Sequence, residues 1–546
     1  MMFVAQLGVG AACLPLLAPS GAPPADALGL EAASLALPSN VLVITLDDIG
    51  VDLIGAYETW YVAQGRPPGQ PAHTPAIDSL LAAQGILFTE CWTAPMCTPS
   101  RARLLTGKYG MRSGIGAVLK ETETFGYLNP GLQTTEVILP QLLRAGPSSY
   151  TSVALGKWHL VDTPMRTLIP AHPLGSPSGT WFDRYAGAMF NLQNPQLGSG
   201  VNTYSSWIKT YCSFLDPNVA PCPNGALPCD VLKFAPPAAN YATVDTTEDA
   251  LFMVATLTEP WFLYVAYNAA HSPVHDIPSD LPSTACGNYL PNDSPCDSGA
   301  NPTFASRLRC MVEELDNQIG RLLCSVDATD TTVILISDNG TDPNGLLAPH
   351  DRSSAKGTVK EGGIRVPMII RAPLQGAGTP GRVSRALVSS TDILATVAAI
   401  AGAPVPSGIG TDSVSMLPYI AGFQGSLRKF VYSESFFPNF QPDPVTGGPP
   451  ASYVTNRHMQ AIREQRFKLI RRTDRDQNMG STVTVTEQLY DLLQGGVPDP
   501  VTGATTPDWF EENDLLASGL PLSARAQRAL QVLRNKLNAQ YPSLCR

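Results

Sequence analysis

Four short apolar runs constrain the fold of this 546-residue chain more than any other feature. Each run is rich in β-branched or aromatic residues and bounded by polar ones, and they occupy residues 40–46, 151–155, 261–267 and 332–336. Such runs predict buried strands of a largely parallel sheet. Helical periodicity lies between them, at residues 75–84, 304–325 and 391–401. Strands that alternate with helices predict a doubly wound α/β domain, in which helices flank a mostly parallel sheet.

The first predicted helix carries its own start signal. Pro75 is expected at the first helical position and Thr74 at the N-cap, because proline fits the first turn and threonine can accept a bond from a free amide.

Polar residues follow three of the predicted strands at one rim of the sheet. Asp47-Asp48 comes after the first strand, Asp338-Asn339 after the last, and His271 beyond the strand at 261–267. In open α/β sheets, ligands bind outside the carboxyl ends of the strands. We therefore expect a functional site at this rim.

Composition excludes several other classes of protein. Apolar residues make up 44% of the chain, enough to bury a large core, and charged residues only 15%. The formal net charge of −10 argues against a nucleic-acid-binding surface. No apolar run approaches the roughly 20 residues that a membrane-spanning helix needs. A collagen, a coiled coil, an integral membrane protein and a basic nucleic-acid-binding protein are therefore excluded.

Residues 1–36 are expected to form a leader and a linker. They are apolar and then small and Pro-rich, which is typical of a signal peptide, although no Lys or Arg precedes Arg66. They predict export, to the extracellular space or the periplasm. The string ending in Cys13 leaves a lipid anchor open as an alternative.

A Pro- and Gly-rich stretch at 438–450 predicts a linker between two domains. The expected catalytic domain covers residues 37–440, and a small α+β domain with an antiparallel sheet covers 441–546. In the small domain we expect two antiparallel strands, at 460–470 and 482–491, and a terminal helix at 522–539.

The eleven cysteines are too few for a disulfide scaffold in a chain of this length. Five of them lie in loop-like sequence where bridges form in exported proteins: Cys212, Cys222, Cys229, Cys286 and Cys296. Cys286 with Cys296 is the first pair expected. Cys310 and Cys324 share one predicted helix, about 21 Å apart at 1.5 Å per residue, and cannot bridge each other. Several buried unpaired cysteines remain an alternative.

The most specific string in the sequence is Cys97-Thr98-Pro99-Ser100-Arg101, which runs on to Leu-Thr-Gly at Gly107. Pro99 can begin a helix, and free N–H groups at a helix start favour an anion. Arg101 lies one turn on and can bind an oxyanion through charge-assisted bonds. The string thus places a nucleophile beside an anion site, although a half-buried structural cysteine would fit it as well.

Six further motifs follow the same order as in one enzyme family, and the chain resembles the type I, arylsulfatase-like sulfatases from residue 40 to about 491. The Cys-x-Pro-Ser-Arg string is that family's signature. The other strings are Asp47-Asp48-Ile49-Gly50, Gly156-Lys157-Trp158-His159-Leu160, His271-Ser272-Pro273, Ser337-Asp338-Asn339-Gly340, Lys356-Gly357-Thr358 with Glu361-Gly362-Gly363, and, in the C-terminal domain, Arg466-Phe467-Lys468-Leu469 with Leu489-Tyr490-Asp491.

The resemblance implies an alkaline-phosphatase-like fold and the hydrolysis of a sulfate ester. In this family the cysteine, here Cys97, is oxidised to formylglycine by a formylglycine-generating enzyme, and its gem-diol forms a covalent sulfo-enzyme intermediate. The substrate would be a sulfated small molecule or glycan. Asp47, Asp48, Asp338 and Asn339, together with the modified residue 97, would bind Ca²⁺. Oxygen-only ligands of this kind suit a hard cation, so Mg²⁺ remains the alternative.

The resemblance also implies roles for the basic residues. Arg101, Lys157, His271 and Lys356 would bind the sulfate, and His271 and Lys356 would serve the leaving group. Asp338 would act as a base, and His159 would serve residue 97. Lys157 and His159 lie two residues apart, so in an extended segment they share one face.

Two other functions stay open. One is a phosphonate or phosphodiester hydrolase with the same nucleophile. Asn339 favours a sulfatase over this alternative, because related phosphonate and phosphodiester hydrolases have His at that position. The other is a catalytically silent protein that binds sulfated glycans. Residues 171–244 are expected to form part of the substrate mouth. Five histidines match no motif, of which His275 and His350 could line that mouth: His73, His172, His275, His350 and His458.

Overall fold

The computed structural model describes most of the chain from Asn40 onward. The described residues are 40–119, 129–161, 175–176, 179–192, 203–213, 229–233, 241–287, 289–291, 296, 299, 301–373, 380–443, 447–451, 453–476, 482–494 and 507–545. The predicted leader, Cys13, Cys222, His172 and most of the predicted mouth segment lie outside them.

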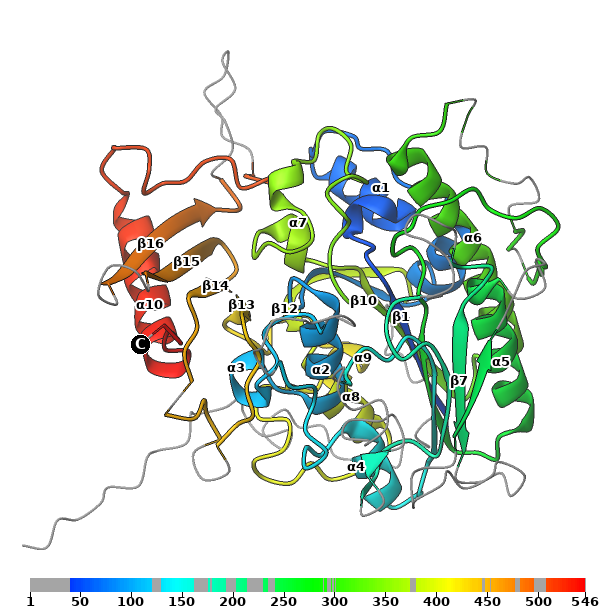
Figure 1. The fold of residues 1–546 in the computed structure, drawn as a ribbon. Helices are drawn as coiled ribbons and strands as arrows, with labels where there is room; N and C mark the ends of the chain where they lie inside the picture. The colour runs from blue at the N-terminus through cyan, green and yellow to red at the C-terminus, as the bar shows by residue number, and fades with distance from the viewer. Residues whose placement is uncertain are drawn as a thin grey trace, which may run out of the picture. The chain divides into compact units, whose positions relative to one another are not determined.

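A mixed ten-stranded sheet forms the centre of the fold (Figure 1). Its strand order is β12-β2-β11-β10-β1-β9-β3-β6-β7-β8. The middle of the sheet is parallel, where β1 lies between β10 and β9 and β3 lies between β9 and β6. The strands are β1 (Asn40–Leu46), β2 (Ile86–Trp92), β3 (Thr151–Gly156), β6 (Arg184–Gly187), β7 (Ile208–Ser213), β8 (Cys229–Lys233), β9 (Trp261–Ala266), β10 (Thr331–Ser337), β11 (Met368–Arg371) and β12 (Arg382–Ser389).

Helices cover both faces of this sheet. Because successive residues of each strand point to opposite sides, each strand contributes side chains to two cores. Val41 and Val43 pack with side chains of α2, α4 and α8 in one core, whereas Leu42 and Ile44 pack with α1, η3, α5 and α6 in the other. The predicted α/β class is therefore confirmed. The helices of the large sheet are α1 (Gly55–Ala63), η3 (Ile77–Ala82), α2 (Cys97–Thr106), α3 (Gly110–Ser113), α4 (Leu139–Ala145), α5 (Ala242–Thr256), α6 (Phe304–Ser325), α7 (Glu361–Ile364), α8 (Asp392–Ile400) and α9 (Leu417–Ile420). Short elements are η2 (Val51–Leu53), η6 (Arg352–Ser354), β4 (Gly175–Ser176) and β5 (Gly179–Thr180).

Pro75 begins the helix after Thr74, as predicted, and the Thr74 carbonyl accepts from the Asp78 amide (2.9 Å), but the Thr74 side chain does not cap the helix. The Thr74 hydroxyl accepts from the Gly55 amide and donates to Asp78. The first amides of the helix, those of Ala76 and Ile77, donate instead to the carboxylate of Asp316, at 2.8 and 2.9 Å. Asp316 belongs to α6, so a neighbouring helix supplies the cap, and the segment continues as the π-helix η3.

A second, four-stranded antiparallel sheet lies in the C-terminal part of the chain, with strands β13 (Val431–Phe436), β14 (Arg457–Arg463), β15 (Phe467–Asp476) and β16 (Thr482–Asp491). The predicted run at 460–470 is in fact two strands with a turn between them. The helix α10 (Ala524–Gln540) packs on one face (Figure 1), where Leu533 and Leu537 meet Ile462 and Leu469. The division at residue 440 stays a prediction, and β13 lies on its N-terminal side.

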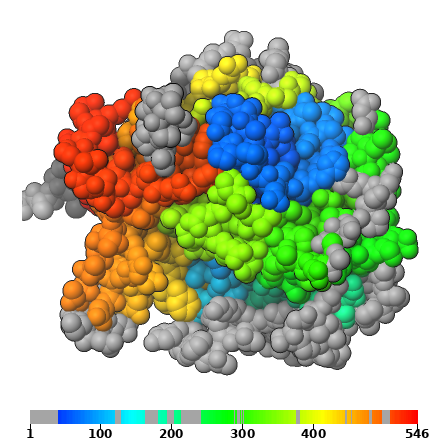
Figure 2. Space-filling view, turned by 90° about the horizontal axis from the view of Figure 1, so that it is seen from above, coloured from blue at the N-terminus to red at the C-terminus, as the bar shows by residue number. Residues whose placement is uncertain are grey.

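The first α-helix of the described chain, α1, contacts a segment near the C-terminus. In Figure 2, part of the C-terminal segment (red) lies beside the first described part of the chain (blue). The rings of Trp509 and Tyr61 make an edge contact there, with centroids 5.6 Å apart.

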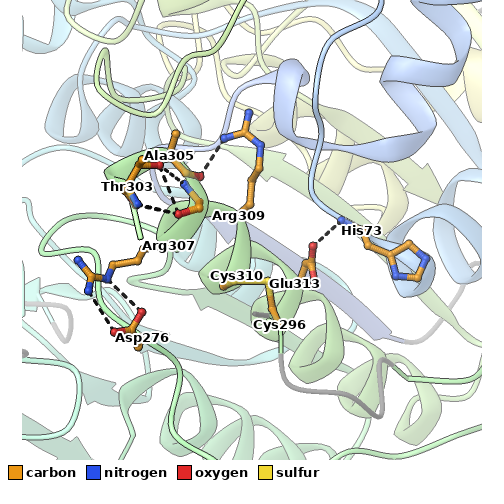
Figure 3. The surroundings of a disulfide bond; sticks show 10 residues. His73, Asp276, Cys296, Thr303, Ala305, Arg307, Arg309, Cys310 and Glu313 are labelled. Atoms are coloured by element: carbon orange, nitrogen blue, oxygen red, sulfur yellow. Dashed lines mark hydrogen bonds and ion pairs between the residues drawn. A yellow bond between two sulfur atoms is a disulfide. The ribbon is translucent and has the colours of Figure 1, made fainter. Parts of the chain in front are cut away.

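The disulfide pairing differs from the prediction. Cys286 bonds to Cys324, and Cys296 bonds to Cys310 (Figure 3), so both bridges join the segment after β9 to the helix α6. The expected Cys286–Cys296 pair is therefore wrong, because the two cysteines face successive parts of one helix and not each other. Cys212 is also disulfide-bonded, and the free thiols among the described residues are the buried Cys91, Cys97 and Cys545.

Within the described part of the chain, no helix combines the length and the apolar character needed to cross a bilayer.

Candidate active site

The ten residues that the sequence singles out lie at strand ends and helix starts on one rim of the large sheet. Nine of them form one network of contacts, and His159 lies at its margin, close enough for Lys157 to affect its pKa. The ten are Asp47, Asp48, Cys97, Arg101, Lys157, His159, His271, Asp338, Asn339 and Lys356.

Asp47 and Asp48 follow β1, where backbone bonds hold them in place. The Asp47 amide donates to the Ala269 carbonyl (3.1 Å), and the Ala270 amide donates to the Asp47 carbonyl (2.8 Å). Asp48 adopts a φ of 62°, in the left-handed region that non-glycine residues visit at a cost and mostly at functional sites. Its amide donates to Asp338, so the ends of β1 and β10 are tied together.

Cys97 is the first residue of α2 and is almost fully buried. Its Sγ lies 3.7 Å from Asp47 Oδ1 and 3.9 Å from Asp48 Oδ1. Burial raises the pKa of the Cys97 thiol to about 12. The unmodified side chain is therefore a protonated thiol at neutral pH, and a poor nucleophile.

Arg101 lies one turn further along α2 and holds Asp338. Its Nε and Nη2 donate to Asp338 Oδ2 at 3.1 and 2.8 Å, and its Nη1 donates to the Lys157 carbonyl at 2.9 Å. Burial and the nearby Asp47 raise the pKa of Asp338 to about 6. Asp338 can therefore exchange a proton near neutral pH, as a general base must.

Two lysines neutralise the paired aspartates. Lys157 Nζ lies 2.5 Å from Asp47 Oδ2, and Lys356 Nζ lies 2.6 Å from Asp48 Oδ1. Burial by itself would raise the pKa of Asp48, but the nearby Lys356 and Lys157 outweigh it and hold that pKa below its ordinary value. Asp48 therefore stays ionised, and the pKa of Lys356 lies well above its ordinary value because Asp48 outweighs the effect of burial.

The two site histidines are neutral, and each has a defined tautomer. His159 Nε2 lies 2.8 Å from the Leu119 carbonyl, which can only accept, so Nε2 carries the proton and Nδ1 is an acceptor. Nδ1 has no partner among the described residues. His271 Nδ1 likewise donates to the Ser272 carbonyl (2.8 Å), and its Nε2 lies 3.8 Å from Asp48. Burial lowers the pKa of both, for His271 to about 3.

The same cluster can hold a hard cation. Ligand atoms of Asp47, Asp48, Cys97 and His271 all lie within 4.8 Å of one another. Asn339 donates through Nδ2 to Asp48 Oδ1 (2.8 Å), whereas its buried Oδ1 has no partner in the described part of the chain. An unsatisfied buried carbonyl oxygen beside three carboxylates is the donor chemistry that Ca²⁺ or Mg²⁺ prefers. The residues present therefore fit such an ion.

Three further side chains support the site. The Thr341 hydroxyl accepts from the Gly50 amide (2.9 Å), and the Ser337 hydroxyl accepts from the Ile49 amide (3.3 Å), which fixes the loop after β1. The Tyr204 hydroxyl lies 2.7 Å from both the Asn268 and His271 carbonyls. Ser337 belongs to a motif singled out in the sequence, whereas only contact across the fold identifies Thr341 and Tyr204.

The four described histidines without a motif are not part of the network of site contacts. His275 packs against the Tyr204 ring and lies 3.0 Å from the Tyr241 hydroxyl, and His350 packs against Phe510. His458 pairs with Glu434 in the small sheet, and the His73 amide donates to Glu313 on α6 (Figure 3).

Comparison with known proteins agrees with this geometry. The sequence profile of the family described as Sulfatase matches residues 39–403. The chain belongs to the sulfatase family. Arylsulfatase A from Bos taurus is 31% identical over 433 residues, which cover 76% of this chain and 73% of that protein. N-acetylgalactosamine-6-sulfatase from Canis lupus familiaris is 29% identical over 424 residues, which cover 74% of this chain and 70% of that protein.

The solved structure of the PsFucS1 sulfatase from Pseudoalteromonas sp. shares the fold, with a TM-score of 0.57, 19% identity and coverage of 94% of this chain and 93% of that chain. The alkaline-phosphatase-like architecture is thus confirmed, and family membership makes the protein a hydrolase of sulfate esters.

Proposed function

We propose that the protein hydrolyses its sulfate ester at residue 97, after Cys97 has been oxidised to formylglycine. The observation that carries this proposal is the position of Cys97 Sγ, less than 4 Å from two ionisable carboxylates at the start of α2. A buried thiol whose pKa is raised to about 12 is a poor nucleophile, which favours an oxidised side chain at this position.

The cation and the modified residue would bring the chemistry that the other residues prepare. Asp47, Asp48, Asp338 and the Asn339 amide would hold Ca²⁺ beside residue 97, where the ion would polarise sulfuryl oxygens and the formylglycine would supply the attacking hydroxyl.

The remaining residues bind the sulfate and move protons. Lys157 and Lys356 lie beside the paired aspartates and bring positive charge to the place where the sulfate would bind. The loss of one such preorganised donor to the transition state typically costs about 2.7–4 kcal/mol. Arg101 acts on the sulfate side by fixing Asp338, the base for the attacking hydroxyl. Lys356, which keeps its proton, serves the departing alcohol, with His271 beside it on the same aspartate. His159 offers the Nδ1 lone pair to the remaining proton of residue 97.

Mass spectrometry of the peptide that contains Cys97 tests the proposal, in protein made with a formylglycine-generating enzyme. We expect conversion of the thiol and hydrolysis of 4-nitrophenyl sulfate. Cys97→Ala should abolish turnover and leave the folded state intact. Cys91→Ala, which removes another buried free thiol, should retain turnover. An unconverted thiol in active protein would contradict the proposal, and so would wild-type rates in Cys97→Ala.

An aryl phosphonate assayed in parallel decides between the two hydrolase functions. A faster phosphonate rate would make the protein a phosphonate hydrolase. The relatives' names suggest an aryl sulfate or a sulfated amino sugar as substrate.

We also propose export for this protein. Disulfides persist in oxidising compartments, and the chain contains the bridges Cys286–Cys324 and Cys296–Cys310.

A further inference from the structure

Two motifs of the sequence have no role in the chemistry above, and they meet in one buried ion pair. These are Glu361-Gly362-Gly363, at the start of α7, and Arg466-Phe467-Lys468-Leu469, at the start of β15. We propose that Glu361 and Lys468 are positioning residues, through which the small antiparallel sheet fixes the turn at Asn339-Gly340 and the loop that carries Lys356. The inference rests on the proposed function, because it concerns the same site.

Glu361 is surrounded by donors from the small sheet and the large one. Its Oε1 lies 3.1 Å from Lys468 Nζ, and its Oε2 lies 3.4 Å from Arg463 Nη1 and 3.4 Å from Trp92 Nε1. Both ends of the pair are buried, with side-chain exposures of 3% for Glu361 and 0% for Lys468. A contact of this kind ties the start of β15 to the start of α7, since a shift of either one would separate buried opposite charges.

The cluster around this pair is balanced in charge. Lys468 Nζ also lies 2.7 Å from Glu511, whose carboxylate accepts from the Glu361 amide, and Arg463 lies 2.7 Å from Glu90 on β2. Arg365 lies 3.5 Å from Glu361 and is the third base of the cluster. The three glutamates are thus balanced by one lysine and two arginines. Burial alone would raise the pKa of Glu361, but Lys468 and Arg463 outweigh it and lower that pKa to about 2.

The backbone next to Glu361 lies directly against the cation site. The Gly340 amide donates to the Gly363 carbonyl (3.0 Å), and a Cβ on Gly340 would lie only 1.8 Å from the Gly362 carbonyl oxygen. Gly340 follows Asn339, whose side chain contacts Asp48. A shift of the α7 start would therefore move the Asn339 turn with it, because the two backbones are in contact with no side chain between them.

The same segment holds Lys356. A Cβ on Gly363 would lie 2.2 Å from the Thr358 carbonyl oxygen, so the turn from Lys356 to Thr358 packs on the start of α7. The Lys356 amide also donates to the Thr341 carbonyl (3.0 Å). Glu361 thus lies between the small sheet and both halves of the site, the cation half at Asn339 and the sulfate half at Lys356.

Glu361→Gln and Lys468→Met, separately and together, test the inference in the full chain. We expect each single variant to lower kcat for 4-nitrophenyl sulfate by about tenfold or more, measured well below its melting temperature. The double variant should be no worse than the weaker single, because residues that act as one unit are not additive. A second readout needs no turnover: the calcium concentration that half-saturates the rise in melting temperature should increase at least about threefold.

Glu434→Gln is the matched control. Glu434 is equally buried, and within the described part of the chain its carboxylate bonds to Met111, Tyr432 and His458, none of which belongs to α7. We expect it to lower the melting temperature while kcat and the calcium midpoint stay within about threefold of wild type.

If Glu361→Gln does not fold, Glu361→Asp and Lys468→Arg take its place with the same readouts. The inference would be overturned if the single variants had a lower melting temperature but an unchanged kcat and calcium midpoint. It would also be overturned if Glu434→Gln lowered kcat as much as they do. A wild type without sulfatase turnover would refute the proposed function alone, because the calcium midpoint still tests the positioning. A wild type that lacks both turnover and a calcium effect would refute both.

Discussion

Arg101→Lys should damage both stability and turnover, and the contacts of Arg101 allow the size to be worked out. The guanidinium makes three bonds, two to Asp338 Oδ2 and one to the Lys157 carbonyl, and it is 1% exposed. A lysine keeps the charge and can replace one of the three. Hydrogen bonds to charged groups contribute about 1.5–3 kcal/mol each, so the loss of two should cost about 3 kcal/mol or more.

Since each 1.4 kcal/mol corresponds to a factor of ten, kcat should fall about 100-fold if this loss appears in the orientation of Asp338. The assays are 4-nitrophenyl sulfate hydrolysis and urea unfolding. Arg103→Lys is the matched control on the same helix, because Arg103 is equally buried but makes one bond of 3.5 Å, with Nε and Nη2 unpartnered among the described residues. An Arg101→Lys enzyme within threefold of wild type, or no more impaired than Arg103→Lys, would refute the reasoning.

Three further predictions concern stability. Burial raises the pKa of Glu314 to about 7, so the folded state binds a proton that the unfolded state releases near pH 4.5, and stability is lost as the pH rises to 7. Glu314→Gln should remove this loss, so that between pH 4 and pH 8 its free energy of unfolding, measured in urea, should rise by up to about 3 kcal/mol relative to that of wild type. Variant and wild type changing equally with pH would contradict this. Replacing both Cys286 and Cys324 by Ala should cost about 2–4 kcal/mol, and non-reducing peptide mapping that found Cys286 joined to Cys296 would contradict the pairing. Gly340→Ala should cost at least about 1–3 kcal/mol, because its Cβ would overlap the Gly362 carbonyl, and an unchanged melting temperature would show that the turn can move.

The sequence predicts the central strands well because their burial is complete and therefore visible locally. Residues 40–46 and 482–491 form β1 and β16 with the predicted bounds, and 304–325 forms α6 with them. Other strands of the sheet, among them β6, β7 and β11, were not predicted, because they are short or mixed in polarity and become strands by pairing with a neighbour. The same limit explains the missed cap at Asp316, a side chain from another helix.

The site follows the same division. Motifs at strand ends predict which residues meet, since parallel strands end at one rim of a sheet. They do not predict that burial raises the pKa of Asp338 to about 6, that Leu119 selects the tautomer of His159, or that Arg101 binds Asp338. These properties depend on neighbours that lie dozens to hundreds of residues away.

The order of residues along the chain thus determined the α/β class, the family and the side chains available at the rim, because strand burial and motif spacing are local properties. The tertiary structure alone decided the cysteine partners, the protonation of the site and the link from Lys468 to Glu361, because each depends on distance through space and on the exclusion of water.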